Sequence, residues 1–244
     1  MFRRPVLLSQ AVRPLRTYGR QTAPLMRRAY ADYRFPGKAE SLEHSQVFKI
    51  SQAIQNDHRE LERYYKKIVS SDDPDEKLRY QNMLIWELAR HSIAEELVVY
   101  PAMEKEITDG KSIAEKDHEQ HQVVKEELYK FQKLKPGDDE FQPTLDKLWD
   151  DLKHHIKEEE ESDLVQLEKA LSLTGSKELS QKFERTKMFT PTRSHPSAPN
   201  RPPFETVAGL MAAPIDKLRD LFTKFPEQET IKVDKTDGAG HGPY

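Results

Sequence analysis

The 244-residue sequence contains no cysteine. This absence excludes disulfide bonds, thiolate zinc sites, cysteine-ligated iron–sulfur clusters and cysteine nucleophiles. Any metal ion bound by the chain must therefore be held by imidazole and carboxylate groups.

Glycine is also scarce, with nine residues, and no strand-like run of valine, isoleucine and threonine lies between turn signals. Both features favour an all-α protein. No apolar run approaches the length needed to cross a bilayer, so we expect no integral membrane segment. Hydrophobic residues form 36% of the chain and charged residues 33%, which predicts a modest core and many solvated helix faces.

Acidic residues are absent from residues 1–30, which hold seven arginines. This segment resembles a mitochondrial targeting peptide, and Arg28-Ala29-Tyr30-Ala31 resembles a site cut by matrix peptidases. We expect a mitochondrial matrix protein that begins near Ala31, with residues 31–42 as an unstructured lead-in; a disordered basic tail is the alternative. The chain after residue 30 carries 32 basic and 42 acidic residues. Because this acidic balance repels phosphate groups, we expect no nucleic-acid partner.

The region from residue 43 to residue 175 has the apolar periodicity of four long helices separated by short turns. We expect these helices at residues 45–69, 75–107, 112–134 and 141–173. Because short connections make neighbouring helices antiparallel, the pattern predicts an up-down-up-down antiparallel four-helix bundle. Pro101 lacks a backbone donor and should bend the second helix near Leu97.

A C-terminal extension follows the predicted bundle. We expect a short helix at residues 176–189, a proline-rich linker at 190–203, an amphipathic helix at 204–225 and a disordered polar tail at 226–244. The amphipathic helix would dock on the outside of the bundle or bind a protein partner.

The motif His-x3-Glu-Glu occurs twice in the predicted bundle, beginning at His91 and at His155. Each copy is preceded by a helical segment that carries its own histidine. His58 lies 33 residues before His91, and His121 lies 34 residues before His155. The sequence therefore predicts two copies of one helical hairpin, with nitrogen and carboxylate groups at equivalent places in each copy.

A histidine and the glutamate four residues later lie one above the other on a helix face. The two motifs and the two leading histidines together provide the candidate metal ligands His58, His91, Glu95, His121, His155 and Glu159. Imidazole and carboxylate suit iron, zinc, copper or manganese, and two carboxylates between histidine-bearing ends favour a pair of ions. The alternative to a metal site is that these histidines are ordinary core residues and the glutamates form a solvated charged run. Burying two carboxylates without cations would cost on the order of several kcal/mol each, which argues against it.

Neighbouring residues leave the ligand set open at two places. His118 lies three residues before His121 and is a candidate extra ligand, and Glu160 is the alternative to Glu159 as a bridge. His154 falls on another side of its helix, so we expect it at the surface.

The blocks at residues 91–101 and 155–160 resemble the hemerythrin-like, or HHE cation-binding, family, and the resemblance covers about residues 45–173. It implies a centre of two non-haem iron ions, oxo- or carboxylate-bridged, in a helical bundle. The four histidines among the candidate ligands would be nitrogen ligands, and the two glutamates would be bridges. The chain departs from the oxygen-carrying hemerythrins at Asp117, where they have a histidine, and its second block has Val165 in place of the proline.

We expect a binding protein, namely a mitochondrial di-iron module for oxygen, nitric oxide or iron itself, with zinc or manganese ranked below iron. The rival hypothesis is a di-iron enzyme that activates oxygen or decomposes peroxide. The sequence has no cofactor fingerprint, dedicated general base or substrate-selective motif, which favours binding. A third hypothesis is a ferritin-like carboxylate site, which needs Glu-x-x-His on two helices. Glu115 and His118 fit, but Asp151 and His154 match only in part, and both His58 and His91 would be unused.

Overall fold

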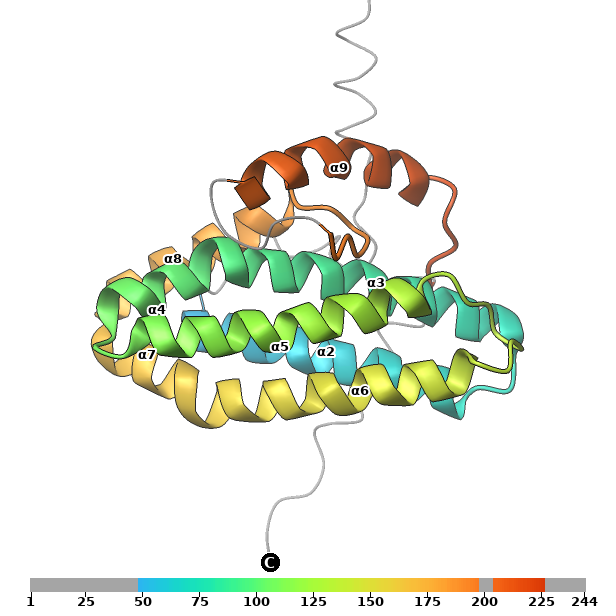
Figure 1. Ribbon diagram of the computed structural model, residues 1–244, viewed down its shortest axis with the longest axis horizontal. Coiled ribbons are helices and arrows are strands. Elements are labelled where there is room, and N and C mark those ends of the chain that lie inside the picture. The colour runs from blue at the N-terminus through green and yellow to red at the C-terminus, as the bar shows by residue number, and fades with distance from the viewer. Residues whose placement is uncertain (1–47, 198–203, 227–244) are drawn as a thin grey trace, which may run out of the picture. The chain divides into compact units, whose positions relative to one another are not determined.

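The computed structural model describes residues 48–197 and 204–226 of the chain (Figure 1). The expected targeting peptide at 1–30, the lead-in at 31–42 and nearly all of the expected tail at 226–244 lie outside the described residues. The same holds for the end of the expected linker, residues 198–203.

Within these ranges the chain is helical and contains no strand, so the predicted all-α class is confirmed. The elements are α2 (Ile50–Ser70), α3 (Pro74–Ala94), η1 (Glu95–Val99), α4 (Tyr100–Glu106), α5 (Gly110–Phe131), α6 (Phe141–Glu158), η2 (Glu159–Asp163), α7 (Leu164–Ala170), α8 (Leu173–Lys187) and α9 (Phe204–Asp220).

The elements η1 and η2 are π-helical turns, and each begins at the first glutamate of one His-x3-Glu-Glu motif. The amide of the residue that follows each turn donates to the carbonyl of that glutamate, five residues back. The expected disturbance near Leu97 thus takes the form of a π turn. Pro101 cannot be the shared cause of the two π turns, because η2 forms although the second motif has Val165 at the position of Pro101. Such turns occur frequently at functional sites.

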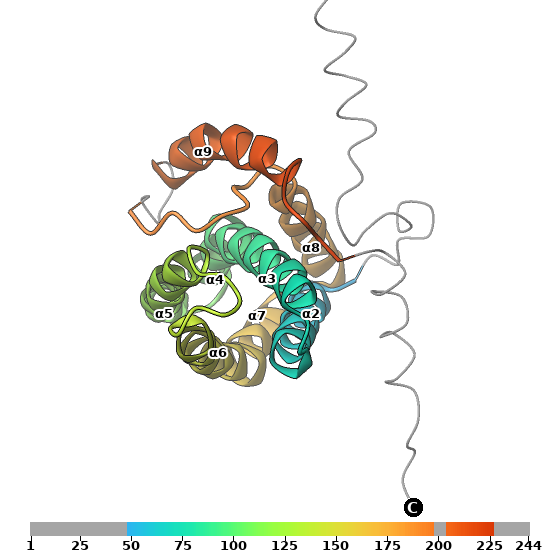
Figure 2. The same cartoon turned by 90° about the vertical axis from the view of Figure 1, so that its right-hand side faces the viewer.

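The helices α2, α3, α5 and α6 lie along one direction, with α4 and α7 extending two of them (Figure 1). Seen nearly along that direction, they surround a common centre (Figure 2). Contacts join α2 to α3, α5 to α6, α4 to α5, and α7 to both α2 and α4. The two motifs therefore face one another from different helices.

The short connection between α4 and α5 depends on Gly110. A Cβ atom at this position would lie 1.8 Å from the carbonyl oxygen of Met103. Only glycine therefore allows α5 to begin so close to the backbone of α4. Met103 itself belongs to a buried apolar cluster with Ile50, Ile54, Tyr100, Leu164 and Leu167, among others.

Helix α8 packs against α2, α3 and η1. Leu179 and Phe183 join the apolar cluster, and the Ser176 hydroxyl accepts a hydrogen bond from the Ile50 amide at 3.0 Å. The Phe183 ring also meets the His91 ring edge-on, with centroids 5.9 Å apart. The helix that we expected at residues 176–189 is therefore in direct contact with one of the candidate ligands.

The segment after α8 is not helical over residues 190–197, and several of its side chains are buried. Arg193 pairs with Asp220 of α9 at 2.8 Å, and the Phe225 ring meets the Trp86 ring of α3 at 6.3 Å. In the described part of residues 204–226, the apolar side chains that are at least 60% exposed are Ile215, Leu218, Leu221 and Phe222. No helix in the described part of the chain has the length and apolarity to span a membrane.

Candidate metal centre

Six side chains meet in the interior from six different elements, and each is almost completely buried. They are His58 from α2, His91 from α3, Glu95 from η1, His121 from α5, His155 from α6 and Glu159 from η2. These are the residues that the repeated motif and its leading histidines select in the sequence.

The first group of potential ligands consists of His58, His91 and Glu95, which can each place one ligand atom within 4.8 Å of the other two. The Nε2 atom of His91 lies 3.2 Å from Oε1 of Glu95. The rings of His58 and His91 meet edge-on, with centroids 5.0 Å apart. This group can hold one metal ion.

The second group consists of Glu95, His121 and His155. The Nε2 atom of His121 lies 3.4 Å from Oε2 of Glu95 and 3.0 Å from Nε2 of His155. Two nitrogens bound to one ion at about 2.1 Å and at a right angle would lie about 3 Å apart, so this spacing suits a shared ion. Glu95 belongs to both groups and turns a different oxygen toward each.

Glu159 provides a second connection between the groups. Its Oε2 atom lies 3.4 Å from Nε2 of His58 and 3.9 Å from Nε2 of His155. The two groups are thus joined by two carboxylates, one from each copy of the motif.

The inner atoms of this cluster fit a cation better than they fit one another. The Nε2 atoms of His58 and His91, and both oxygens of Glu95 and Glu159, are buried without a hydrogen-bond partner in the described part of the chain. Buried polar groups are normally satisfied, so this cluster of atoms without hydrogen-bond partners fits a site that binds a cation. The donor set of imidazole and carboxylate is the one that binds first-row transition metals.

Burial controls the protonation of the cluster. It lowers the pKa of His58 to about 4, and it also lowers the pKa of His121 and, more strongly, of His155. Neutral imidazole is the ligating form of histidine. Burial, and then neighbouring carboxylates, raise the pKa of Glu95 and of Glu159 well above the ordinary value. A bound cation would remove that penalty by stabilising the ionised carboxylates.

A second layer of side chains orients the four imidazoles. The Nδ1 atoms lie close to oxygens of four acceptors: Glu160 at 2.8 Å from His58, Asp57 at 3.3 Å from His91, Glu96 at 3.1 Å from His121, and Gln120 at 2.9 Å from His155. An acceptor at Nδ1 favours the tautomer whose Nε2 lone pair is available to a metal ion. Glu160, which the sequence left as an alternative bridge, lies in this outer layer.

Two histidines singled out in the sequence lie apart from both groups. His118 is buried, and its ring meets Tyr100 edge-on with centroids 4.9 Å apart. The His154 side chain is 67% exposed, and its Nε2 lies 3.5 Å from Glu158. Glu115 is exposed as well, so the Glu-x-x-His pairs of the ferritin-like hypothesis are not gathered at this centre.

Asp117 is a candidate ligand that sequence reasoning did not select. Its side chain is fully buried, and its Oδ1 atom lies 3.6 Å from Nζ of Lys116, although neither carboxylate oxygen has a hydrogen-bond partner among the described residues. Burial, and then the charge of Asp163, raise the pKa of Asp117 to about 7. The available signal was its position one helical turn before His121, which places both residues on one face of α5.

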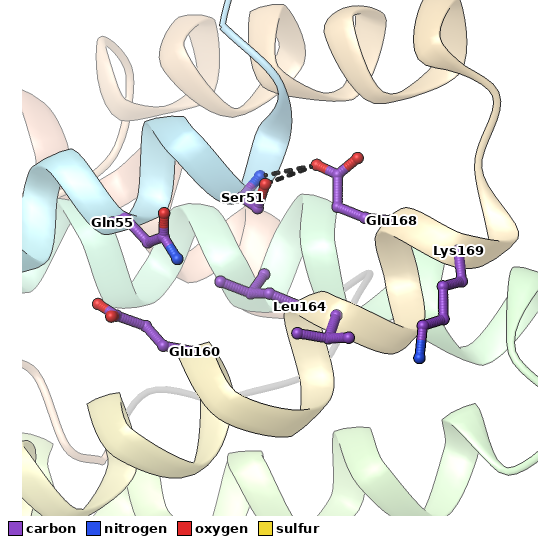
Figure 3. A pocket seen from close by; sticks show the side chains of 7 residues that line it. Ser51, Gln55, Glu160, Leu164, Glu168 and Lys169 are labelled. Carbon is purple, nitrogen blue, oxygen red and sulfur yellow. Dashed lines mark hydrogen bonds between the residues drawn. The ribbon is translucent and has the colours of Figure 1, made fainter.

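A surface pocket of about 320 Å³ lies outside the second layer, between α2 and α7 (Figure 3). Ser51, Gln55, Glu160, Leu164 and Glu168 are among its lining residues, and Glu168 accepts hydrogen bonds from Ser51. None of the six inner residues lines it. The pocket therefore reaches the carboxylate that supports His58 and stops short of the ligands.

Four imidazoles and two shared carboxylates buried among helices define a helical cation-binding protein. Residues 49–167 match the family model of the hemerythrin HHE cation binding domain. An uncharacterised hemerythrin-like protein of Schizosaccharomyces pombe is 56% identical over 179 residues, which cover 73% of this chain and 88% of that protein. The chain belongs to the hemerythrin-like family.

A more distant similarity joins the chain to a Nostoc protein that bears the name DNA nickase. The two are 22% identical over 142 residues, which cover 58% of this chain and 40% of the Nostoc protein. No solved structure matches the chain.

Proposed function

We propose that the protein holds two non-haem iron ions and serves as a binding module for oxygen, for nitric oxide or for iron itself. The observation that carries this proposal is the placement of Glu95. Its two oxygens face histidines of different groups, at 3.2 and 3.4 Å, as a carboxylate that bridges two ions must do.

In this proposal His58 and His91 hold one ion, and His121 and His155 hold the other. Glu95 and Glu159 would be shared between the two ions, and Asp117 would offer a further carboxylate. Iron is preferred over manganese because four of the six candidate ligands are imidazoles, which suit iron better, and over zinc because structural zinc sites usually close with four ligands. When bound, an iron pair supplies redox capacity and open coordination positions.

Tyr100 would act as a hydrogen-bond donor beside this centre. Its hydroxyl lies 2.9 Å from Nε2 of His121, the nitrogen that would bind the ion, so with metal present the hydroxyl would donate to another acceptor at the centre. Burial raises the pKa of Tyr100 well above the ordinary value. The phenol therefore stays protonated at neutral pH and can donate a hydrogen bond, whereas it cannot serve as a general base. This property excludes Tyr100 as the base of a reaction that begins with proton removal.

A di-iron enzyme that activates oxygen or decomposes peroxide is the second candidate. Asp117 favours it, because a third buried carboxylate, whose charge acts on Glu95 and Glu159, would stabilise iron in its higher oxidation state.

Two further proposals concern the setting of the site. We propose that the helices form an up-down-up-down bundle, which the short connections and the contacts between successive helices support. We also propose a mitochondrial matrix location, which the seven arginines and the absence of acidic residues in residues 1–30 support.

Metal analysis combined with optical spectroscopy tests the proposed function. Anaerobic reconstitution with ferrous iron should yield about two iron atoms per chain. A visible band that appears with oxygen or nitric oxide and disappears on degassing would support a binding module, whereas steady consumption of a reductant with oxygen or peroxide would support the enzyme. One zinc per chain, with no iron retained after reconstitution, would overturn both.

A further inference from the structure

Helix α8 ends in a lysine that lies against the candidate metal centre. Lys187 follows the region matched by the family model, residues 49–167, and its side chain is completely buried. The ammonium group forms an ion pair with Asp57 and lies 3.2 Å from Glu184 and 3.6 Å from Glu87. Burying an ammonium group is costly unless nearby carboxylates pair with it, as they do here.

The same oxygen of Asp57 contacts both the ammonium group and an imidazole. Oδ2 of Asp57 pairs with Nζ of Lys187 and lies 3.3 Å from Nδ1 of His91. On the other side of the ring, Nε2 of His91 faces Glu95. A continuous chain of contacts therefore runs from the end of α8 to the shared carboxylate.

Two of the other histidines have cations behind their acceptors in the same way. Lys125 lies 2.5 Å from Glu96, the acceptor of His121, and Arg59 lies 2.5 Å from Glu160, the acceptor of His58. The three cations differ in exposure: the side chain of Lys187 is 0% exposed, that of Lys125 is 12% exposed and that of Arg59 is 58% exposed. Water screens an exposed pair far more than a buried one.

This arrangement has a physical consequence for His91. Oδ2 of Asp57 is held between the ammonium group and the ring, so removing Lys187 would remove one of the contacts that fix this oxygen beside Nδ1 of His91. A displaced oxygen would support His91 less well as the acceptor that leaves the Nε2 lone pair available to a metal ion. The ammonium group therefore keeps Asp57 able to orient the ring.

We propose that Lys187 is a positioning residue of the metal centre, acting through Asp57 on His91, and that α8 is part of the metal-binding unit. The proposal rests on the metal site proposed above. It predicts effects graded by burial, with Lys187 strongest, Lys125 weaker and Arg59 weakest, and it assigns the Lys187 effect to the ion held by His58 and His91.

The test uses the full chain and Co²⁺ as a visible, redox-stable probe, with affinities measured by competition against a chelator. Lys187→Met should weaken one of the two Co²⁺ equivalents about 10- to 100-fold, the usual effect of losing a supporting contact, and leave the other within about threefold. Lys125→Met should weaken the other equivalent by a smaller factor, and Arg59→Met should leave both nearly unchanged. Lys130→Met, which removes an exposed lysine from the same helix as Lys125, is the matched control.

Asp57→Asn keeps the lysine and removes the carboxylate charge with which it pairs, so it tests the proposal if Lys187→Met fails to fold. In the Asp57→Asn background, Lys187→Met should cause no further loss of Co²⁺ affinity. The hyperfine-shifted Nδ1 proton of His91 in the Co²⁺ protein should shift in both single variants, a change that loss of packing alone would not confine to this ring.

The outcomes separate the two proposals. Wild-type protein that binds no second Co²⁺ equivalent would defeat the dinuclear site itself. Wild-type protein that binds two equivalents, with Asp57→Asn and Lys187→Met unchanged or weakened equally at both, would overturn only the role of Lys187.

Discussion

Asp117 is the buried acid whose ionisation should be simplest to follow in metal-free protein. Its pKa is about 7 in the folded chain against an ordinary 3.8. Between these values the folded chain binds a proton that the unfolded chain has released, so stability falls as the pH rises from about 4 to about 7. Asp117→Asn should remove this part of the fall, which amounts to a few kcal/mol at most since one pKa unit corresponds to about 1.4 kcal/mol.

Urea unfolding of chelator-treated wild-type and Asp117→Asn protein at pH 5 and pH 8 measures that difference. The lowered pKa of His58 acts with the opposite sign below about pH 6.5, but it is common to both proteins and cancels in the comparison. Equal pH dependence in the two proteins would show that Asp117 is already ionised without metal.

Adjacent histidines on α6 offer a matched pair of substitutions. His155 is buried among the candidate ligands, and His154 points to solvent. His155→Ala should abolish most of the rise in melting temperature that iron confers, because a ligand is lost. His154→Ala should stay within about 0.5 kcal/mol of wild type. Thermal unfolding with and without iron provides the measurement, and equal damage from both variants would contradict the ligand assignment.

At the level of residues, spacing was informative only for side chains that repeat. The second motif placed His155 and Glu159 opposite the first, and the structure brings them together. Asp57 and Gln120 lie outside the motif and carry no such signal, because a polar residue beside a ligand looks like an ordinary solvated helix position. Their role depends on where neighbouring helices place the imidazole rings, and single-helix periodicity does not contain that information.

At the scale of elements, the turn between α4 and α5 offers a prediction about packing. Gly110→Ala should destabilise the protein by about 2 kcal/mol or more, because the new methyl group would overlap the backbone of α4. Gly175→Ala is the control, since its nearest neighbour is the side-chain oxygen of Ser172 at 3.2 Å, which can move. Chemical denaturation of both variants measures the change in the free energy of unfolding. Similar small decreases in the two variants would show that the backbone of α4 moves easily to accept the methyl group.

The expected helix at residues 75–107 is divided in the structure into α3, η1 and α4. Apolar periodicity could not reveal this division, because one extra residue in a turn shifts the pattern by less than the width of the apolar stripe. Helix positions were predictable to within a few residues, since caps and turn residues mark them. The close contact of α8 with the centre was not predictable, because a short amphipathic helix carries no sign of where it docks.

At the scale of the whole molecule, the N-terminal segment tests the proposed location. Residues 1–40 fused to a fluorescent protein should direct it to mitochondria, because an arginine-rich, acid-free segment is drawn toward the negative matrix. A variant with the seven arginines replaced by glutamine should remain in the cytosol. Mass spectrometry of the imported full chain should find a new N-terminus near Ala31, and a diffuse signal from the unaltered fusion would contradict the proposal.

The π turn at η1 makes folding and metal binding separable by the loss of one residue. A π turn is an α-helix with a single residue inserted, so deleting Val98 would join α3 to α4 as one regular helix without changing how either meets its neighbours. Glu95 and Glu96 would then lose the wide turn that carries them. We expect the product to be a stable helical protein that no longer binds the proposed metal ions, obtained by deleting a single codon.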